Sequence, residues 1–179
     1  MDRLAGHQVE VLLSEEEIRQ RVAELGRRVT DDYQGRNLVL IGVLKGAATF
    51  LVDLARQIDL PLAMDFMAVS SYGASTESSG VVRITKDLDA SLEGKDVLVV
   101  EDIIDTGLTL KYMLDILWAH NPSSVRICAL FDKVKDRKAD VAVDYVGFVI
   151  PDKFVVGYGL DYAENFRNLP YLGILLTDK

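Results

Sequence analysis

Residues 97–109 constrain the fold and the chemistry of this 179-residue chain more than any other stretch. The stretch opens with the apolar run Val97-Leu-Val-Val100, continues with Glu101 and Asp102, and ends in a turn of small residues. A run that is apolar at every position is typical of a strand buried on both faces of a parallel sheet. We therefore expect the two acids at the carboxyl end of that strand, where open α/β sheets bind their ligands.

The residues that follow the acid pair indicate a sugar-phosphate site. Adjacent carboxylates can accept hydrogen bonds from neighbouring hydroxyls, such as the 2′ and 3′ hydroxyls of a ribose. Thr106, Gly107 and Thr109 can then bring backbone N–H groups and two hydroxyls together at the start of the next helix. Because such N–H groups bind phosphate, the stretch predicts a cradle for a ribose phosphate.

The other predicted elements alternate along the chain, which indicates an α/β fold. Ser14 and Glu17 have the spacing of a capping box, and apolar residues recur at helical spacing from there to Val29. Further helices are expected at residues 47–58 and 109–120, and strands at residues 37–43, 62–69, 81–85, 97–100, 125–130 and 145–150. This order favours a parallel, doubly wound sheet. A chain of this length is large enough for one core, so we expect a single domain over residues 1–179.

Composition and spacing exclude several classes of protein. The formal net charge of -8 disfavours a nucleic-acid partner. No apolar run approaches the ~18 residues that span a membrane, and no signal-peptide core is present, so we expect no membrane partner and a cytoplasmic location. Cys128, the single cysteine, is expected to be a buried small hydrophobe. The glycine spacings of Walker A loops and dinucleotide folds are absent, and too little chain follows Asp102 for a response-regulator receiver.

Four motifs, separated along the chain, carry a resemblance to a known family. They are Gly42-Val-Leu-Lys-Gly46, Ser71-Tyr72-Gly73, Val99-Val-Glu-Asp-Ile-Ile-Asp-Thr-Gly107 and Ile150-Pro-Asp-Lys-Phe-Val-Val-Gly-Tyr-Gly-Leu-Asp-Tyr162. With them, residues 39–169 resemble the purine phosphoribosyltransferases, and among these the hypoxanthine-guanine enzymes. The resemblance implies a type I phosphoribosyltransferase fold, with a mostly parallel twisted sheet flanked by helices, a small hood from the N- and C-terminal segments, and a flexible loop.

The activity that the resemblance implies is a step of purine salvage. The phosphoribosyl group of 5-phospho-α-D-ribosyl 1-diphosphate (PRPP) would pass to hypoxanthine or guanine, giving IMP or GMP and pyrophosphate. Asp105 would be the catalytic general base and acid at purine N7. The PRPP-binding residues would be Lys45, Gly46, Glu101, Asp102, Asp105, Thr106, Gly107, Leu108, Thr109 and Arg167. Leu108 stands where some relatives carry a longer polar or basic residue, so we expect only a backbone contact there.

Metal, purine and lid residues follow from the same resemblance. Mg²⁺ would be held by Glu101, Asp102 and Asp161. The purine would contact Lys133, Phe154, Val155 and Asp161. Lys133 would favour a 6-oxo group, because an ammonium group cannot accept a hydrogen bond from a 6-amino group. Ser71 and Tyr72 would belong to a lid formed by residues 71–80. The resemblance also implies a homodimer or homotetramer and allows a cis Leu44-Lys45 peptide.

Simpler interpretations of these residues remain open at this point. Asp105 would also suit the N-cap of the following helix. Lys133 could belong to an ordinary charged connection over residues 132–140, Phe154 to the core, and Arg167 and Lys45 to the charged surface. Two other functions also remain, a nucleotide-binding regulator with this fold and a phosphoribosyltransferase that prefers xanthine.

Overall fold

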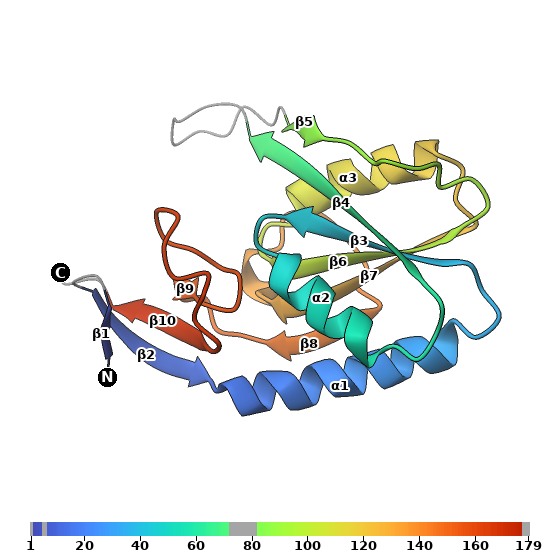
Figure 1. Cartoon of the computed structure of the whole chain (residues 1–179). Helices are drawn as coiled ribbons and strands as arrows, with labels where there is room; N and C mark the ends of the chain where they lie inside the picture. Colours follow the sequence, from blue (N-terminus) through green and yellow to red (C-terminus); the bar gives the residue numbers. More distant parts are fainter. Residues whose placement is uncertain (1, 5–6, 72–81, 177–179) are drawn as a thin grey trace.

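The computed structural model of the protein describes residues 2–4, 7–71 and 82–176, and a six-stranded sheet forms the centre of this part (Figure 1). Its strand order is β5-β4-β3-β6-β7-β8. The strands are β3 (Leu38–Leu44), β4 (Ala63–Ser71), β5 (Val82–Lys86), β6 (Asp96–Ile104), β7 (Ser124–Asp132) and β8 (Tyr145–Val149). All neighbours pair in parallel except β4 and β5, which pair antiparallel. The predicted mostly parallel α/β sheet is confirmed, with β5 as its one antiparallel strand in the described part of the chain.

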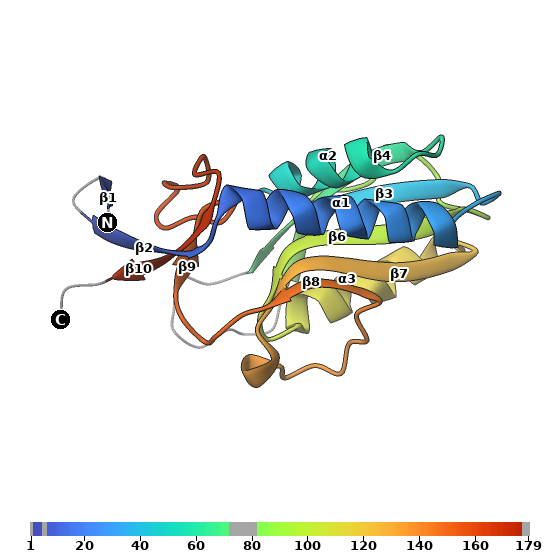
Figure 2. The same ribbon diagram turned by 90° about the horizontal axis from the view of Figure 1, so that it is seen from below.

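Helices cover both faces of this sheet (Figures 1 and 2). The helices α1 (Glu15–Asp32) and α2 (Ala48–Gln57) lie on one face, and α3 (Leu108–Ala119) lies on the other. Successive residues of β3 point to opposite faces, so Leu40 packs in the core beneath α1 and α2, and Ile41 packs in the core beneath α3. The predicted capping box is present, because Ser14 Oγ accepts from Glu17 N at 3.3 Å and Glu17 accepts from Ser14 N at 2.8 Å.

A second, smaller sheet combines the two ends of the described chain. It has the order β1-β2-β10-β9, from β1 (Asp2–Leu4), β2 (His7–Leu13), β9 (Val155–Val156) and β10 (Leu172–Leu176). Figure 1 shows this hood beyond the carboxyl ends of the central strands. Sequence patterns predict none of these strands, because the sheet depends on the pairing of β2 with β10, which come from opposite ends of the chain.

The strand order reverses between β3 and β6, and this position determines where a ligand can bind. The chain passes from β3 to β4 on one side and from β6 to β7 on the other, so the ends of β3 and β6 form the switch point at which open α/β sheets bind ligands. Cys128 is fully buried in β7, as predicted. Among the described helices, none is long and apolar enough to cross a membrane.

Candidate active site

Glu101 and Asp102 are buried in the last part of β6, beside this reversal. The predicted strand ended at Val100, but β6 continues to Ile104, so both acids belong to the strand rather than follow it. Their exposed fractions are 8% and 9%. Burial raises the pKa of Glu101 well above its usual range, with a further contribution from the charge of Asp102. Burial likewise raises the pKa of Asp102 to about 6, although Ile103 N donates to its carboxylate. The pair is therefore poorly compensated and suited to a cation or to hydroxyl donors.

The turn after β3 packs directly on the Asp102 carboxylate. A β-carbon at Gly46 would overlap Asp102 Oδ2, so only glycine allows this approach. On its other side, a β-carbon at Gly159 would overlap the Gly46 carbonyl oxygen. The Leu44-Lys45 peptide that leads into the turn is cis. As a result, the turn of Lys45 and Gly46 lies between the acids of β6 and the hood segment around Gly159.

The predicted phosphate turn lines a cavity of about 130 Å³, and Glu101 is part of the same lining. The lining residues are Glu101, Ile103, Ile104, Asp105, Thr106, Gly107, Thr109 and Leu110. Gly107 has a φ of 76°, a left-handed conformation that favours glycine, and it is the N-cap of α3. The alternative that Asp105 caps this helix is therefore wrong, which leaves its half-exposed carboxylate free to face the cavity.

The charged connection after β7 is anchored to this turn, although Lys135, Lys138 and Asp140 are exposed. The Thr106 carbonyl accepts hydrogen bonds from Lys138 N at 2.9 Å and from Ala139 N at 3.0 Å. Arg137 holds the connection to the sheet through a buried ion pair, with 2.5 Å between its Nη2 and Asp132 Oδ1. Lys133 is only 9% exposed, and its Nζ lies 3.9 Å from Asp105 Oδ2. These contacts contradict the interpretation of Lys133 as part of an ordinary exposed loop.

The predicted purine-contacting aromatic residue is on the surface. Phe154 is 53% exposed, so it is not a core residue, and its ring meets the Tyr162 ring edge to face at 5.7 Å between centroids. The next residue, Val155, is buried in β9, where it pairs with Ile174 of β10. The Phe154 ring thus lies exposed directly before β9, where it is available for stacking on a base.

The two expected pyrophosphate cations each have an acidic partner in the loop before β10. Arg167 Nη2 lies 2.8 Å from Asp161 Oδ1, and Lys45 Nζ lies 2.8 Å from Glu164 Oε2. The hydrogen bond from Lys45 and its charge lower the pKa of the Glu164 carboxyl. Sequence patterns did not single out Glu164, although its place between Asp161 and Arg167 is a signal that could have identified it.

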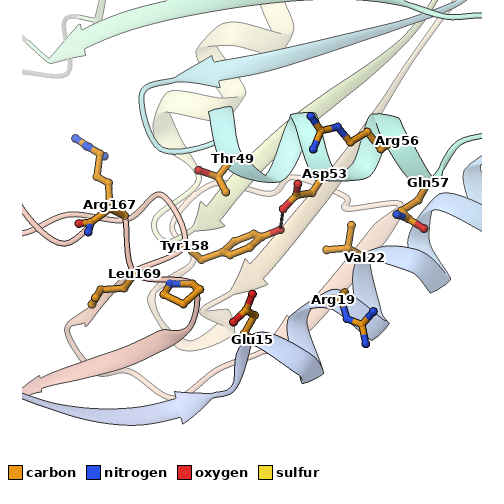
Figure 3. Close-up of a pocket in the computed structure, with 12 residues that line it drawn as sticks. Glu15, Arg19, Val22, Thr49, Asp53, Arg56, Gln57, Tyr158, Arg167 and Leu169 are labelled. Carbon is orange, nitrogen blue, oxygen red and sulfur yellow. Dashed lines mark hydrogen bonds between the residues drawn. The ribbon is translucent and has the colours of Figure 1, made fainter. Parts of the chain in front are cut away.

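A larger cavity of about 500 Å³ lies beside this group, between α1, α2 and residues 158–170 (Figure 3). Tyr158 crosses it, and its hydroxyl donates to Asp53 Oδ2 at 2.7 Å. Arg167 also contributes to the lining, whereas the acid pair of β6 does not. The sequence offered no indication of Asp53, whose partner is 105 positions away in the chain.

Comparison with known proteins identifies the family. The phosphoribosyl transferase domain family matches residues 8–163. The chain belongs to this family. The hypoxanthine-guanine phosphoribosyltransferase of Bacillus subtilis is 57% identical over 170 residues, which cover 94% of each chain. The structure of a hypoxanthine phosphoribosyltransferase from Staphylococcus aureus has a TM-score of 0.90 at 54% identity, covering 93% of this chain and 91% of that one.

One relative is much longer than this phosphoribosyltransferase chain. The bifunctional protein TilS/HprT of Listeria monocytogenes is 56% identical over 165 residues, and the matched part covers 92% of this chain but 26% of that protein. The match therefore concerns one part of the longer relative. Together with the neighbouring structures, family membership confirms the predicted type I phosphoribosyltransferase fold.

Many of the predicted site residues of this phosphoribosyltransferase are joined by contacts at the ends of β3 and β6, since Gly46 packs on Asp102, most residues of the 101–109 stretch line one cavity and Lys133 lies near Asp105. The lid is the exception. Ser71 is the last residue of β4 rather than the first of a loop, and Tyr72 with the rest of the predicted lid lies outside the described residues. In the described part of the chain, no three His, Cys, Asp or Glu side chains are grouped closely enough to hold a metal ion alone. A metal held by Glu101, Asp102 or Asp161 would therefore need further ligands from substrate or water.

Proposed function

We propose that this phosphoribosyltransferase transfers the phosphoribosyl group of PRPP to hypoxanthine or guanine, forming IMP or GMP and pyrophosphate. The main support is one arrangement, in which Glu101 of the buried acid pair lines the same cavity as the predicted phosphate turn. The first suits ribose hydroxyls, and the second suits the 5′-phosphate. The names of the similar proteins from Bacillus subtilis and Staphylococcus aureus support the choice of purine.

The transfer reaction separates charge, and the predicted site residues match that separation. As pyrophosphate leaves, positive charge develops on the ribose ring, and the carboxylates of Glu101 and Asp102 can stabilise it. Lys45 and Arg167 would bind the negative leaving group, the latter with a fork that suits bidentate contacts. The Thr106 to Thr109 turn, including the Leu108 backbone N–H at the start of α3, would hold the 5′-phosphate.

Purine recognition would involve the connection after β7 and the strand β9. Phe154 would stack on the base, the Val155 backbone would contact the ring edge, and Lys133 would donate to the 6-oxo group. Asp105 would accept the N7 proton as the bond from N9 to C1′ forms. Its distance of 3.9 Å from Lys133 supports this role, because the purine edge carries N7 beside the 6-oxo group.

Mg²⁺ is the expected cofactor, and the acids of the site fit it. Magnesium in such sites is bound by one or two carboxylates together with substrate phosphates. Buried acids with raised pKa values gain stability from a nearby cation, as Glu101 and Asp102 would here. Asp161 would help to position a second ion, which requires its carboxylate to be shared with Arg167. Bound Mg²⁺ would neutralise charge on the pyrophosphate.

We also propose that Ser71 and Tyr72 belong to a lid that screens the reacting ribose from water. A separate proposal, which family membership suggests, is that the chain forms a homodimer or homotetramer. Light scattering on the purified protein tests the oligomeric state, and a monomer would refute that part. For the lid, Tyr72→Ala should lower turnover with PRPP and increase its hydrolysis without purine.

The test of the function is an assay of pyrophosphate release from PRPP with each of four purines. Hypoxanthine and guanine should be substrates, and adenine should not. A clear preference for xanthine would favour the xanthine enzyme, and no turnover with any purine would favour a regulator. Asp105→Asn should lower turnover strongly while PRPP still binds. Asp115→Asn, an exposed acid on α3, is the matched control and should leave turnover unchanged.

A further inference from the structure

We propose that Glu164 sets the affinity of the site for the diphosphate group, because its carboxylate occupies the cations that would bind that group. Glu164 Oε2 lies 2.8 Å from Lys45 Nζ, and Glu164 Oε1 lies 3.7 Å from Arg167 Nη2. One carboxylate thus bridges two cations from distant parts of the chain. A diphosphate that binds Lys45 and Arg167 would have to take the place of the Glu164 carboxylate between them. The inference rests on the proposed role of Lys45 and Arg167 in pyrophosphate binding.

The backbone of the loop fixes where the Glu164 side chain starts. Tyr162 N donates to Asn165 O at 3.1 Å, and Asn165 N donates to Tyr162 O at 3.0 Å, which closes a tight turn. Glu164 itself has a φ of 65°, and its N–H donates to Asp161 Oδ2 at 2.9 Å. Figure 1 shows this loop, between β9 and β10, beside the turn that joins β3 to α2. The side chain is therefore directed towards Lys45 by a constrained turn.

An incoming diphosphate must break the contact between Glu164 and Lys45. The bound diphosphate then lies near the Glu164 carboxylate, which is also negatively charged, because the turn keeps Glu164 close to Lys45. Both effects weaken binding of PRPP and of pyrophosphate, and neither concerns the purine. The effect is moderate, because the side chains of Lys45 and Glu164 are 65% and 66% exposed. Exposed ion pairs of this kind change binding constants by roughly two- to fivefold.

Glu164→Gln removes the charge but keeps the shape of the side chain. It should lower the KM for PRPP and the inhibition constant of pyrophosphate by about two- to fivefold each. The KM for hypoxanthine should stay unchanged. Glu24→Gln is the matched control, because Glu24 is also an exposed acid that pairs with an arginine, Arg21, at 2.7 Å. It removes the same charge from α1 and should change none of these constants.

Lys45→Gln, alone and combined with Glu164→Gln, separates this inference from the proposed function. Lys45→Gln alone should raise the KM for PRPP, and in its background Glu164→Gln should have a smaller effect. If Lys45→Gln leaves the KM for PRPP unchanged, the proposed role of Lys45 is wrong. If Lys45→Gln raises it while Glu164→Gln fails to lower it, the inference about Glu164 is wrong and the proposed function stands.

Discussion

Replacing Asp102 by Asn should stabilise the protein without ligands at neutral pH, even though it should impair substrate binding. The carboxylate is 9% exposed, and burial raises its pKa from 3.8 to about 6. Asn has nearly the same shape and can still accept the hydrogen bond that Ile103 N donates at 2.8 Å. It carries no charge, so it avoids the cost of placing a charge in this position.

The pKa shift gives the sign and the size of the effect. Because the folded chain holds the Asp102 proton more tightly than the unfolded chain, it binds more protons between about pH 4 and pH 6. The free energy of unfolding therefore falls as pH rises through this window. A shift of about two units corresponds to roughly 3 kcal/mol, which is fully lost above about pH 7. The unfolding free energy of Asp102→Asn should therefore exceed that of the parent protein by roughly 3 kcal/mol more at neutral pH than at acidic pH. This difference corresponds to roughly 6–12 °C in Tm.

Urea unfolding without Mg²⁺ or PRPP, at intervals from pH 4.5 to pH 8, measures this gain. The difference in unfolding free energy between Asp102→Asn and the parent protein should increase with pH and then level off. Asp115→Asn, with its exposed position on α3, should show no such increase. An equal difference for Asp102→Asn at every pH would refute the argument from burial.

Three further substitutions test the purine face, the connection after β7 and the phosphate turn. Phe154→Ala should raise the KM for hypoxanthine by the equivalent of about 1–3 kcal/mol, with little change in Tm because the ring is half-exposed; a large fall in Tm with an unchanged KM would identify a packing role instead. Arg137→Met should lower the unfolding free energy by about 3–5 kcal/mol in urea, because it leaves buried Asp132 unpaired, and adding Asp132→Asn should recover part of the loss. Equal losses in the single and double variants would contradict this account. Gly107→Ala should cost about 1–2 kcal/mol of stability at a φ of 76° and raise the KM for PRPP; an unchanged KM would exclude the turn from phosphate binding.

The sequence predicted the central sheet well because the signal there is local. The apolar run before Glu101 located the strand and its acids, and the capping box located the first helix. The predicted end of β6 was four residues too early, because Ile103 and Ile104 pair with Phe131 and Asp132 of β7. Such pairing depends on the neighbouring strand, and no feature of residues 101–104 alone indicates it.

Other features of the site depend on contacts between distant parts of the chain. Lys45 and Glu164 are 119 positions apart, and the segments between them must fold before the two side chains meet. The pairing of the hood strands β2 and β10 likewise joins segments from opposite ends of the chain. Lys133 illustrates an intermediate case, because the family motifs identified it, but its burial became evident only from the packing of residues 132–140 on the phosphate turn.

The two hydrogen bonds that the Thr106 carbonyl accepts have a consequence for redesign of the enzyme. They fix the number of residues between Lys133 and Ala139, because both ends of this segment are anchored, one to β7 and one to the phosphate turn. An inserted residue would add up to ~3.5 Å of chain and displace Lys133 or break the anchor. Libraries aimed at new purine analogues should therefore vary side chains such as Phe154 and keep the length of this segment constant.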